Sequence, residues 1–126
     1  MKKYRLVIFT MMFALLVAIT GVSAANYSKT KTTNVSYGTQ CTGKITDKAT
    51  VNSSSLDWTF SLSGSTVLSS NGYTFAKPYT SSVTYTNARK KAAHKVGYYF
   101  YNSSGNNVGG NITTINFTYN GSNAVN

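Results

Sequence analysis

Short segments in which apolar and polar residues alternate restrict the fold of this chain more than any other feature. Between positions 56 and 62, apolar residues take the even positions and polar residues the odd ones. A two-residue period is typical of a β-strand that buries one face. Shorter versions recur at 73–75, 83–85 and 115–119. Because Ser, Thr and Asn are abundant and strong helix formers are scarce, we expect strands and turns rather than helices.

The segment CTGKITDKATV carries a further apolar face. In an extended chain this face is made by Cys41, Ile45, Ala49 and Val51. We expect a bend or turn near Asp47 to interrupt it. Cys41 is the only cysteine, which excludes an internal disulfide and leaves burial or a link to another chain. Its place on the apolar face favours burial.

Turn signals separate these segments and set the expected architecture. Stretches such as NSSS, SGS, SSNG and NSSGNNVGGN are rich in residues that favour turns. About seven short strands spaced in this way predict an all-β fold, a small antiparallel β-sandwich or barrel-like domain. We expect a single domain over residues 26–126, with a flexible polar arm at its N-terminus and a frayed tail at its C-terminus.

Residues 1–25 have the layout of a secretory signal peptide. A basic start precedes an apolar run from Leu6 to Ile19, and the small residues of GVSAAN allow cleavage after Ala24 or Ala25. The apolar run is shorter than the ~20 residues of a spanning helix, which argues against the alternative of a retained membrane anchor. The sequence therefore predicts a secreted, extracellular protein whose mature form does not span a membrane. The cationic chain without disulfides favours a Gram-positive source.

The charge is one-sided. The whole chain carries a net charge of +10, and removal of the leader leaves nine basic residues against Asp47 and Asp57. Such an excess predicts attraction to polyanions such as teichoic acids, phospholipid headgroups or acidic glycans, although it could also serve solubility alone. Nucleic acid fits the charge as well, but export makes it a less natural partner.

Residues for catalysis are scarce. Glycoside hydrolysis usually needs two carboxylates beside the bond, and Asp57 lies on a polar face where a pair with a lysine is the simplest role. Nothing in the sequence brings Cys41 and His94 together as a nucleophile and its base. One His, one Cys and two Asp at uncharacteristic spacing form no metal-ligand set. We therefore predict a non-enzymatic protein without cofactor or metal.

The segment NARKKAAHKVGYYFYN is the strongest candidate for a binding surface. If it forms a strand, one face is apolar and the other basic and aromatic. The expected buried face contains Ala92, His94, Val96, Tyr98 and Phe100. The expected exposed face contains Arg89, Lys91, Lys95, Gly97, Tyr99 and Tyr101, with Gly97 as a gap that receives a ligand. A short helix starting at Asn87, a good N-cap, is the alternative.

These observations favour one function and leave two others open. The favoured function is binding of an anionic cell-envelope polymer or cell-wall precursor through the charges of Arg89, Lys91 and Lys95 and the rings of Tyr99 and Tyr101. The first alternative is a neutral carbohydrate-binding module in which surface tyrosines dominate. The second is a structural surface or matrix subunit that assembles through sheet edges or Cys41.

The stretch YTNARKKAAHKVGYYFYN also resembles the septum-inhibiting lactococcin family of secreted bacteriocins. The matching positions are Tyr85, the following lysines, and His94 leading into an aromatic strand. Family members carry a tryptophan in a Gly-rich stretch near the mature N-terminus, whereas Trp58 lies mid-chain in a Ser-rich one. The resemblance implies a small β-protein that acts as a bacteriocin on cell-wall precursor, with Tyr85, His94 and the adjacent lysines as its site.

Overall fold

The structure is a computed structural model that describes residues 24–121 and 124–126. The expected leader lies outside the described residues except for Ala24 and Ala25. The described chain forms β1 (Asn26–Tyr37), β2 (Cys41–Asn52), β3 (Trp58–Ser69), β4 (Thr74–Phe75), β5 (Tyr79–Thr86), β6 (Lys91–Tyr101) and β7 (Asn107–Thr118). The all-β prediction of about seven strands is therefore confirmed.

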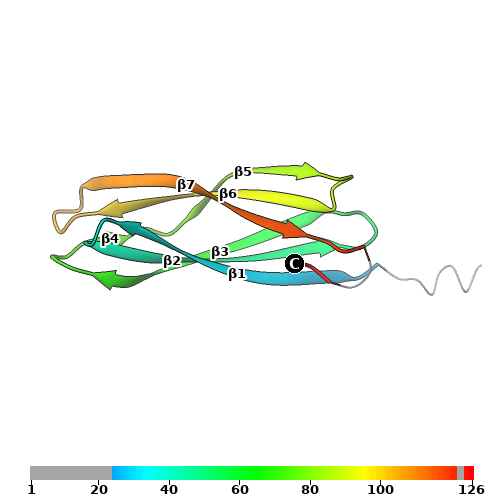
Figure 1. Ribbon diagram of the computed structural model, residues 1–126, viewed down its shortest axis with the longest axis horizontal. Helices are drawn as coiled ribbons and strands as arrows, with labels where there is room; N and C mark the ends of the chain where they lie inside the picture. Colours follow the sequence, from blue (N-terminus) through cyan, green and yellow to red (C-terminus); the bar gives the residue numbers. More distant parts are fainter. Residues whose placement is uncertain (1–23, 122–123) are drawn as a thin grey trace, which may run out of the picture.

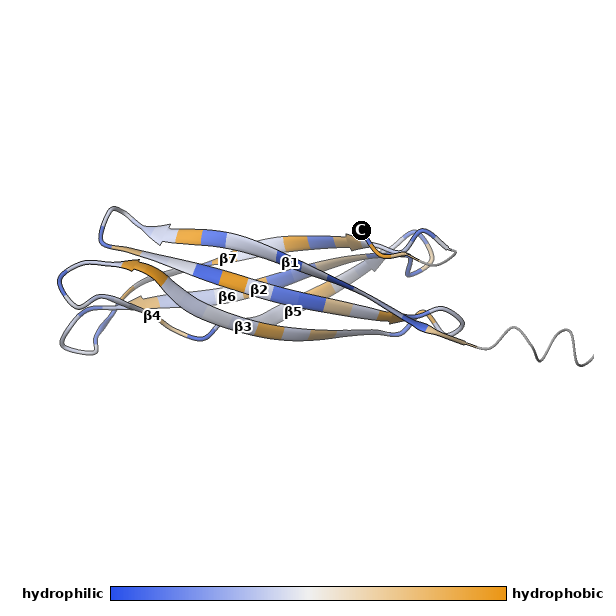
Figure 2. Ribbon diagram, turned by 90° about the horizontal axis from the view of Figure 1, so that it is seen from below, coloured by the Kyte–Doolittle hydropathy of each residue, from blue (hydrophilic) through white to orange (hydrophobic). Residues whose placement is uncertain are grey.

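The strands form two antiparallel sheets that pack face to face (Figure 1). The first sheet has the order β1-β2-β3, so β2 is its central strand. In the second sheet β6 is central, with β7 along one side and β5 followed by the short β4 along the other. Bands of hydrophobic and hydrophilic residues follow one another along the strands, as a sandwich with one buried face per sheet requires (Figure 2).

Strand β2 corrects one expectation. No bend occurs at Asp47, because β2 runs without interruption and pairs with β1 along its whole length. Asp47 therefore stays on the same face as its apolar neighbours and has no exposed surface. That face consists of Cys41, Gly43, Ile45, Asp47, Ala49 and Val51, all buried. The expected burial of Cys41 is confirmed.

The core lies between the two central strands. Ile45 and Val51 from β2 meet Ala92 and Val96 from β6 in one cluster of buried residues. Aromatic rings extend this cluster toward one end of the sandwich; they belong to Trp58, Phe60 and Phe117. The indole Nε1 of Trp58 donates a 2.7 Å hydrogen bond to the Arg89 carbonyl, which satisfies its polar atom.

Both chain ends differ from the expectation. The expectation of a flexible N-terminal arm at 26–34 is wrong, because these residues form the first part of β1 and pair with β2 from Asn26 onward. At the other end, the described residues 124–126 lie against the sandwich, contrary to the frayed tail expected there. Tyr119 pairs with Val125, Val125 is buried, and Thr118 and Asn126 exchange two backbone hydrogen bonds.

The turn between β5 and β6 decides between the strand and the short helix that were the two alternatives for the basic segment. Strand β6 begins at Lys91, and the residues before it form a tight turn, so the helical alternative is wrong. Asn87, Ala88 and Arg89 all have positive φ angles, between 52° and 65°. This left-handed conformation is unfavourable for Ala and Arg, so contacts of the turn must hold it.

Candidate functional site

The exposed side of β6 forms the centre of the outer face of the four-stranded sheet. Ala92, His94, Val96 and Phe100 point into the core and are at most 2% exposed, as the alternation predicts. The remaining core-facing residue, Tyr98, is half-buried. The opposite parity places Lys91, Ala93, Lys95, Gly97, Tyr99 and Tyr101 on the outer side. The structure thus confirms the division of this strand into two faces.

Lys91 and Lys95 are exposed and lie among small polar side chains. The neighbours of Lys91 on the adjacent strands are Thr86 and Thr118, and those of Lys95 are Ser82 and Thr114. In the described part of the chain no acidic side chain faces these lysines, because Asp47 is buried and Asp57 contacts Arg89 at 3.8 Å. The two ammonium groups therefore remain available to an external anion.

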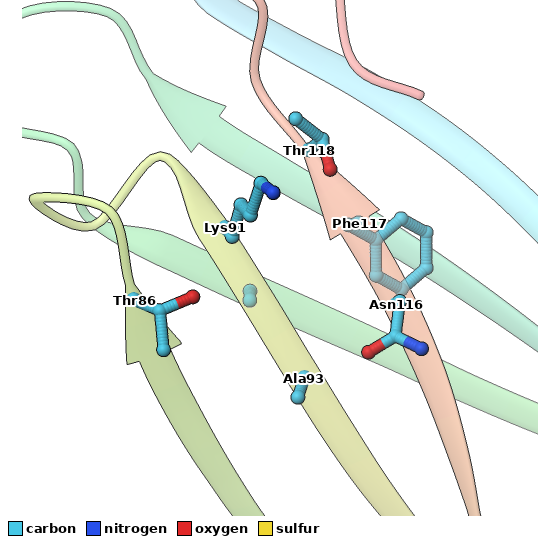
Figure 3. Close-up of a pocket in the computed structure, with 7 residues that line it drawn as sticks. Thr86, Lys91, Ala93, Asn116, Phe117 and Thr118 are labelled. Carbon is cyan, nitrogen blue, oxygen red and sulfur yellow. The ribbon is translucent and has the colours of Figure 1, made fainter.

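A hollow of about 290 Å³ opens between the strands beside Lys91. Its lining includes the small side chain of Ala93, with Thr86 and Lys91 on one side and Asn116 and Thr118 on the other (Figure 3). Two hydroxyl groups, an amide and an ammonium group thus border a shallow space. Such a set can donate hydrogen bonds to a phosphate, a carboxylate or a sugar hydroxyl.

The expected gap at Gly97 is not open. The ring of Tyr79 lies over this glycine, so close that a Cβ there would be 2.2 Å from Tyr79 Cζ. Tyr99 covers Gly110 on the neighbouring strand in the same way. The two tyrosine rings stack with centroids 5.7 Å apart, and the Tyr79 hydroxyl donates to the Tyr99 hydroxyl at 3.2 Å. The position expected to receive a ligand is occupied by the protein's own ring.

This tyrosine pair forms a flat, partly exposed platform next to Lys95. Tyr79 is 42% and Tyr99 38% exposed, and the exposed Ile112 lies beside Gly97 on β7. The hydrogen bond with Tyr99, together with partial desolvation, raises the pKa of Tyr79. Tyr101 shares the outer parity but is half-buried near the far end of the strand. Tyr99 is thus the better placed of the two tyrosines predicted for stacking.

Arg89 does not belong to the exposed row, contrary to the sequence prediction. Its Nε donates to the Leu56 carbonyl at 3.1 Å, and its guanidinium carbon lies 4.1 Å from the centre of the Tyr85 ring. With Asp57, these contacts join the β5–β6 turn to the loop between β2 and β3. The prediction that Asp57 pairs with a lysine is therefore wrong. Arg89 instead connects the two loops at one end of the sandwich.

His94 takes part in a hydrogen-bonded chain that the sequence prediction missed. Its Nδ1 lies 2.6 Å from Asp47 Oδ2, and its Nε2 lies 2.8 Å from Thr80 Oγ1. His94 and Asp47 are fully buried, whereas Thr80 is exposed. The Phe60 ring lies against the imidazole, with the ring centres 4.2 Å apart. One signal in the sequence could have indicated that Asp47 is buried: it has an odd-numbered position, as do its apolar neighbours Ile45 and Ala49.

The order hydroxyl, imidazole, carboxylate is that of a hydrolase relay. The hollow beside Lys91, however, does not include Thr80 in its lining. Asp47 Oδ1 has no hydrogen-bond partner among the described residues, so this carboxylate is incompletely satisfied. We interpret this row of hydrogen-bonded side chains as a polar link between the sheets, in which Thr80 covers the imidazole.

Two kinds of feature are absent from the described part of the chain, residues 24–121 and 124–126. It contains no cluster of three or more His, Cys, Asp or Glu side chains that could hold a metal ion. It also contains no helix with the length and apolar character needed to cross a bilayer. Comparison with known protein families, with curated proteins and with solved structures found no match to this chain.

Proposed function

We propose that the protein is a secreted, non-enzymatic cationic domain that binds an anionic polymer of the cell envelope. The binding surface is the outer face of the four-stranded sheet, centred on Lys91, Lys95 and the hollow at Ala93. The observation that carries the proposal is that these two lysines lie in a hydroxyl-rich surface without an acidic neighbour among the described residues.

The spacing of the lysines suits a repeating ligand. Four residues of a β-strand span about 13 Å, so Lys91 and Lys95 present two charges along one direction of the sheet. An extended polymer with regularly spaced phosphates can contact both, while Thr86, Thr114 and Asn116 offer hydrogen bonds to the groups between them. Among cell-envelope polymers, a polyol-phosphate chain of the teichoic-acid type has this chemistry.

The test compares two variants of equal net charge. Lys91→Ser/Lys95→Ser removes the proposed site, whereas Lys29→Ser/Lys77→Ser removes two exposed lysines elsewhere. At about 1 kcal/mol for each lysine, the first variant should bind purified cell walls roughly thirtyfold more weakly, and the control should bind like the wild type. Equal binding by the wild type and both variants would refute the proposal.

The antimicrobial form of this proposal rests on the resemblance to the lactococcin family. Of the matching positions, Tyr85 is half-buried beneath Arg89 and His94 is fully buried, so only the lysines are accessible to a target. Growth inhibition of Gram-positive indicator strains should therefore depend on Lys91 and Lys95. If growth inhibition survives the replacement of both lysines by Ser, the inhibitory activity does not depend on this surface.

The Tyr79–Tyr99 platform favours a second candidate function, binding of a neutral glycan. Stacked, partly exposed rings held flat over glycines suit contact with the face of a sugar. Salt distinguishes the two functions, because binding through exposed charges weakens as ionic strength rises and ring stacking hardly changes. Binding that persists unchanged in high salt would favour the neutral glycan.

A further inference from the structure

The outer face of the three-stranded sheet has a second pair of lysines in the same arrangement. On β2 the even-numbered residues point away from the buried row, and they include Lys44 and Lys48. Both are exposed, and both lie on the central strand of their sheet, as Lys91 and Lys95 do. The two pairs also share the four-residue spacing, about 13 Å along the strand.

The neighbours of this second pair repeat the chemistry of the first. Lys44 lies between Asn34 of β1 and Ser65 of β3, and Lys48 lies between Thr30 and Ser61. Most of the remaining residues of the face are small and hydroxylated: Ser28, Thr32, Ser36, Thr42, Thr46, Thr50, Thr59 and Ser63. The exception is the end of the face beside Thr42, where the exposed Leu68 is paired with it. Hydrogen bonds between Ser28 and Thr50, at 2.7 Å, and between Ser36 and Thr42, at 3.0 Å, fix part of this array.

The positive charge of this face is not neutralised by acidic side chains either. The sequence contains only two acidic residues, Asp47 and Asp57. Asp47 points into the core toward His94, and Asp57 contacts Arg89 at the end of the sandwich. Two faces of a thin sandwich therefore carry matching, unneutralised lysine pairs that point in opposite directions. Between Lys44 and Lys48 the three-stranded face carries only small polar side chains, and its large apolar residues, Val67 and Leu68, lie at the end beside Thr42. The part of the face around the two lysines is therefore complementary to an anionic, hydroxylated chain.

We propose that the outer face of the three-stranded sheet is a second binding site for a polyol-phosphate polymer, so that one molecule joins two polymer strands. This inference rests on the proposed function, because it assigns the same ligand class to a second face. Lys44 and Lys48 supply charge to phosphates, and the flanking Ser, Thr and Asn side chains hydrogen-bond to the polyol. Two opposed sites convert a binding protein into a cross-linking protein, which also increases avidity on a dense polymer layer.

The test measures stoichiometry and cross-linking separately. A short glycerol-phosphate oligomer that spans one lysine pair is titrated by calorimetry, and a long glycerol-phosphate polymer is followed by light scattering. The wild type should bind two oligomers and produce strong scattering with the polymer. Lys44→Ser/Lys48→Ser should bind one oligomer, with unchanged affinity at the remaining site, and should lose most of the scattering. Lys29→Ser/Lys77→Ser is the control of equal charge and should behave as the wild type.

The outcomes separate this inference from the proposed function. If Lys44→Ser/Lys48→Ser keeps two oligomers and full scattering, or if the wild type binds only one oligomer, the second site is refuted. In that case a loss of binding in Lys91→Ser/Lys95→Ser still supports the proposed function. If neither double variant changes binding, both proposals fail. Urea unfolding of each variant checks that these exposed substitutions leave the fold intact.

Discussion

His94 Nδ1 and Asp47 Oδ2 lie 2.6 Å apart and join the central strands of the two sheets through a fully buried contact. The pair lies within an otherwise apolar core, between Ile45 and Ala49 on one strand and beside Val96 on the other. Burial of polar groups is unfavourable unless they are paired, so each residue depends on the other. The contact fixes the position of one sheet relative to the other. It therefore also fixes the relative position of the two outer faces.

Removal of one partner should therefore destabilise the protein strongly. Asp47→Leu keeps a similar volume but leaves His94 Nδ1 without a partner, and we expect a loss of about 3–5 kcal/mol in the free energy of unfolding. The double variant Asp47→Leu/His94→Leu removes both polar groups and should recover most of that loss. Urea unfolding followed by Trp58 fluorescence measures both. A double variant as unstable as the sum of the single variants would contradict this account.

Thr80 should contribute less to the stability of the protein than the contact between Asp47 and His94. Thr80→Val replaces the hydroxyl that lies 2.8 Å from His94 Nε2 by a methyl group, so the Nε2 of a fully buried imidazole loses this partner. We expect a loss of about 1–3 kcal/mol in unfolding free energy. The same variant tests the non-enzymatic proposal, because Thr80 occupies the place of a nucleophile. Hydrolysis of p-nitrophenyl acetate should be equal for the variant and the wild type, and a loss specific to Thr80→Val would indicate catalysis.

The tyrosine platform should respond to a single methyl group. In Gly97→Ala the added Cβ would collide with the end of the Tyr79 ring, which must then leave the sheet. Because that ring is partly exposed, stability should fall by only about 1 kcal/mol, while the loss of the hydrogen bond to Tyr99 should lower the pKa of Tyr79. Tyrosinate absorbance during an alkaline titration reports the pKa. Tyr99→Phe is the matched control, since it removes the hydrogen bond but keeps the stacked ring.

Cys41 should react slowly in the folded protein. Burial raises the pKa of the Cys41 thiol, and the thiolate is the form that attacks alkylating reagents. Iodoacetamide at pH 8 should modify the native protein far more slowly than the urea-unfolded chain. The unfolded thiol loses its proton first as pH rises, so the contribution of Cys41 to stability should be constant below about pH 8.5 and fall above it. Rapid alkylation of the native protein would place Cys41 outside the core.

Alternation is a local property, so the sequence was sufficient to predict strands that show it, such as β3. It did not predict the first part of β1, where the polar residues 26–34 show no such alternation. It correctly placed Cys41 and Val96 in the core and Lys91 and Lys95 outside it. It failed where the answer depends on contacts between distant segments. The partner of Asp47 is His94, far along the chain and on the other sheet, so no local pattern distinguishes a buried aspartate from one in a bend.

The same limit applies to the candidate site. Gly97 looked like an open gap because nothing near it in sequence shows that Tyr79, on the adjacent strand, lies over it. Arg89 continues the parity of the lysines, yet the turn of positive φ angles directs its side chain to Leu56 and Asp57. Strand register and turn geometry decide both cases, and neither follows from residue type alone.

The salt dependence of binding tests the central claim most directly. Binding of the wild type, Lys91→Ser/Lys95→Ser and Lys29→Ser/Lys77→Ser to a glycerol-phosphate polymer is measured over a series of salt concentrations. We predict that wild-type affinity falls steeply as salt rises, and that the Lys91→Ser/Lys95→Ser variant binds more weakly at low salt with a shallower decline, whereas the control follows the wild type. Identical affinities for all three proteins at every salt concentration would contradict the account.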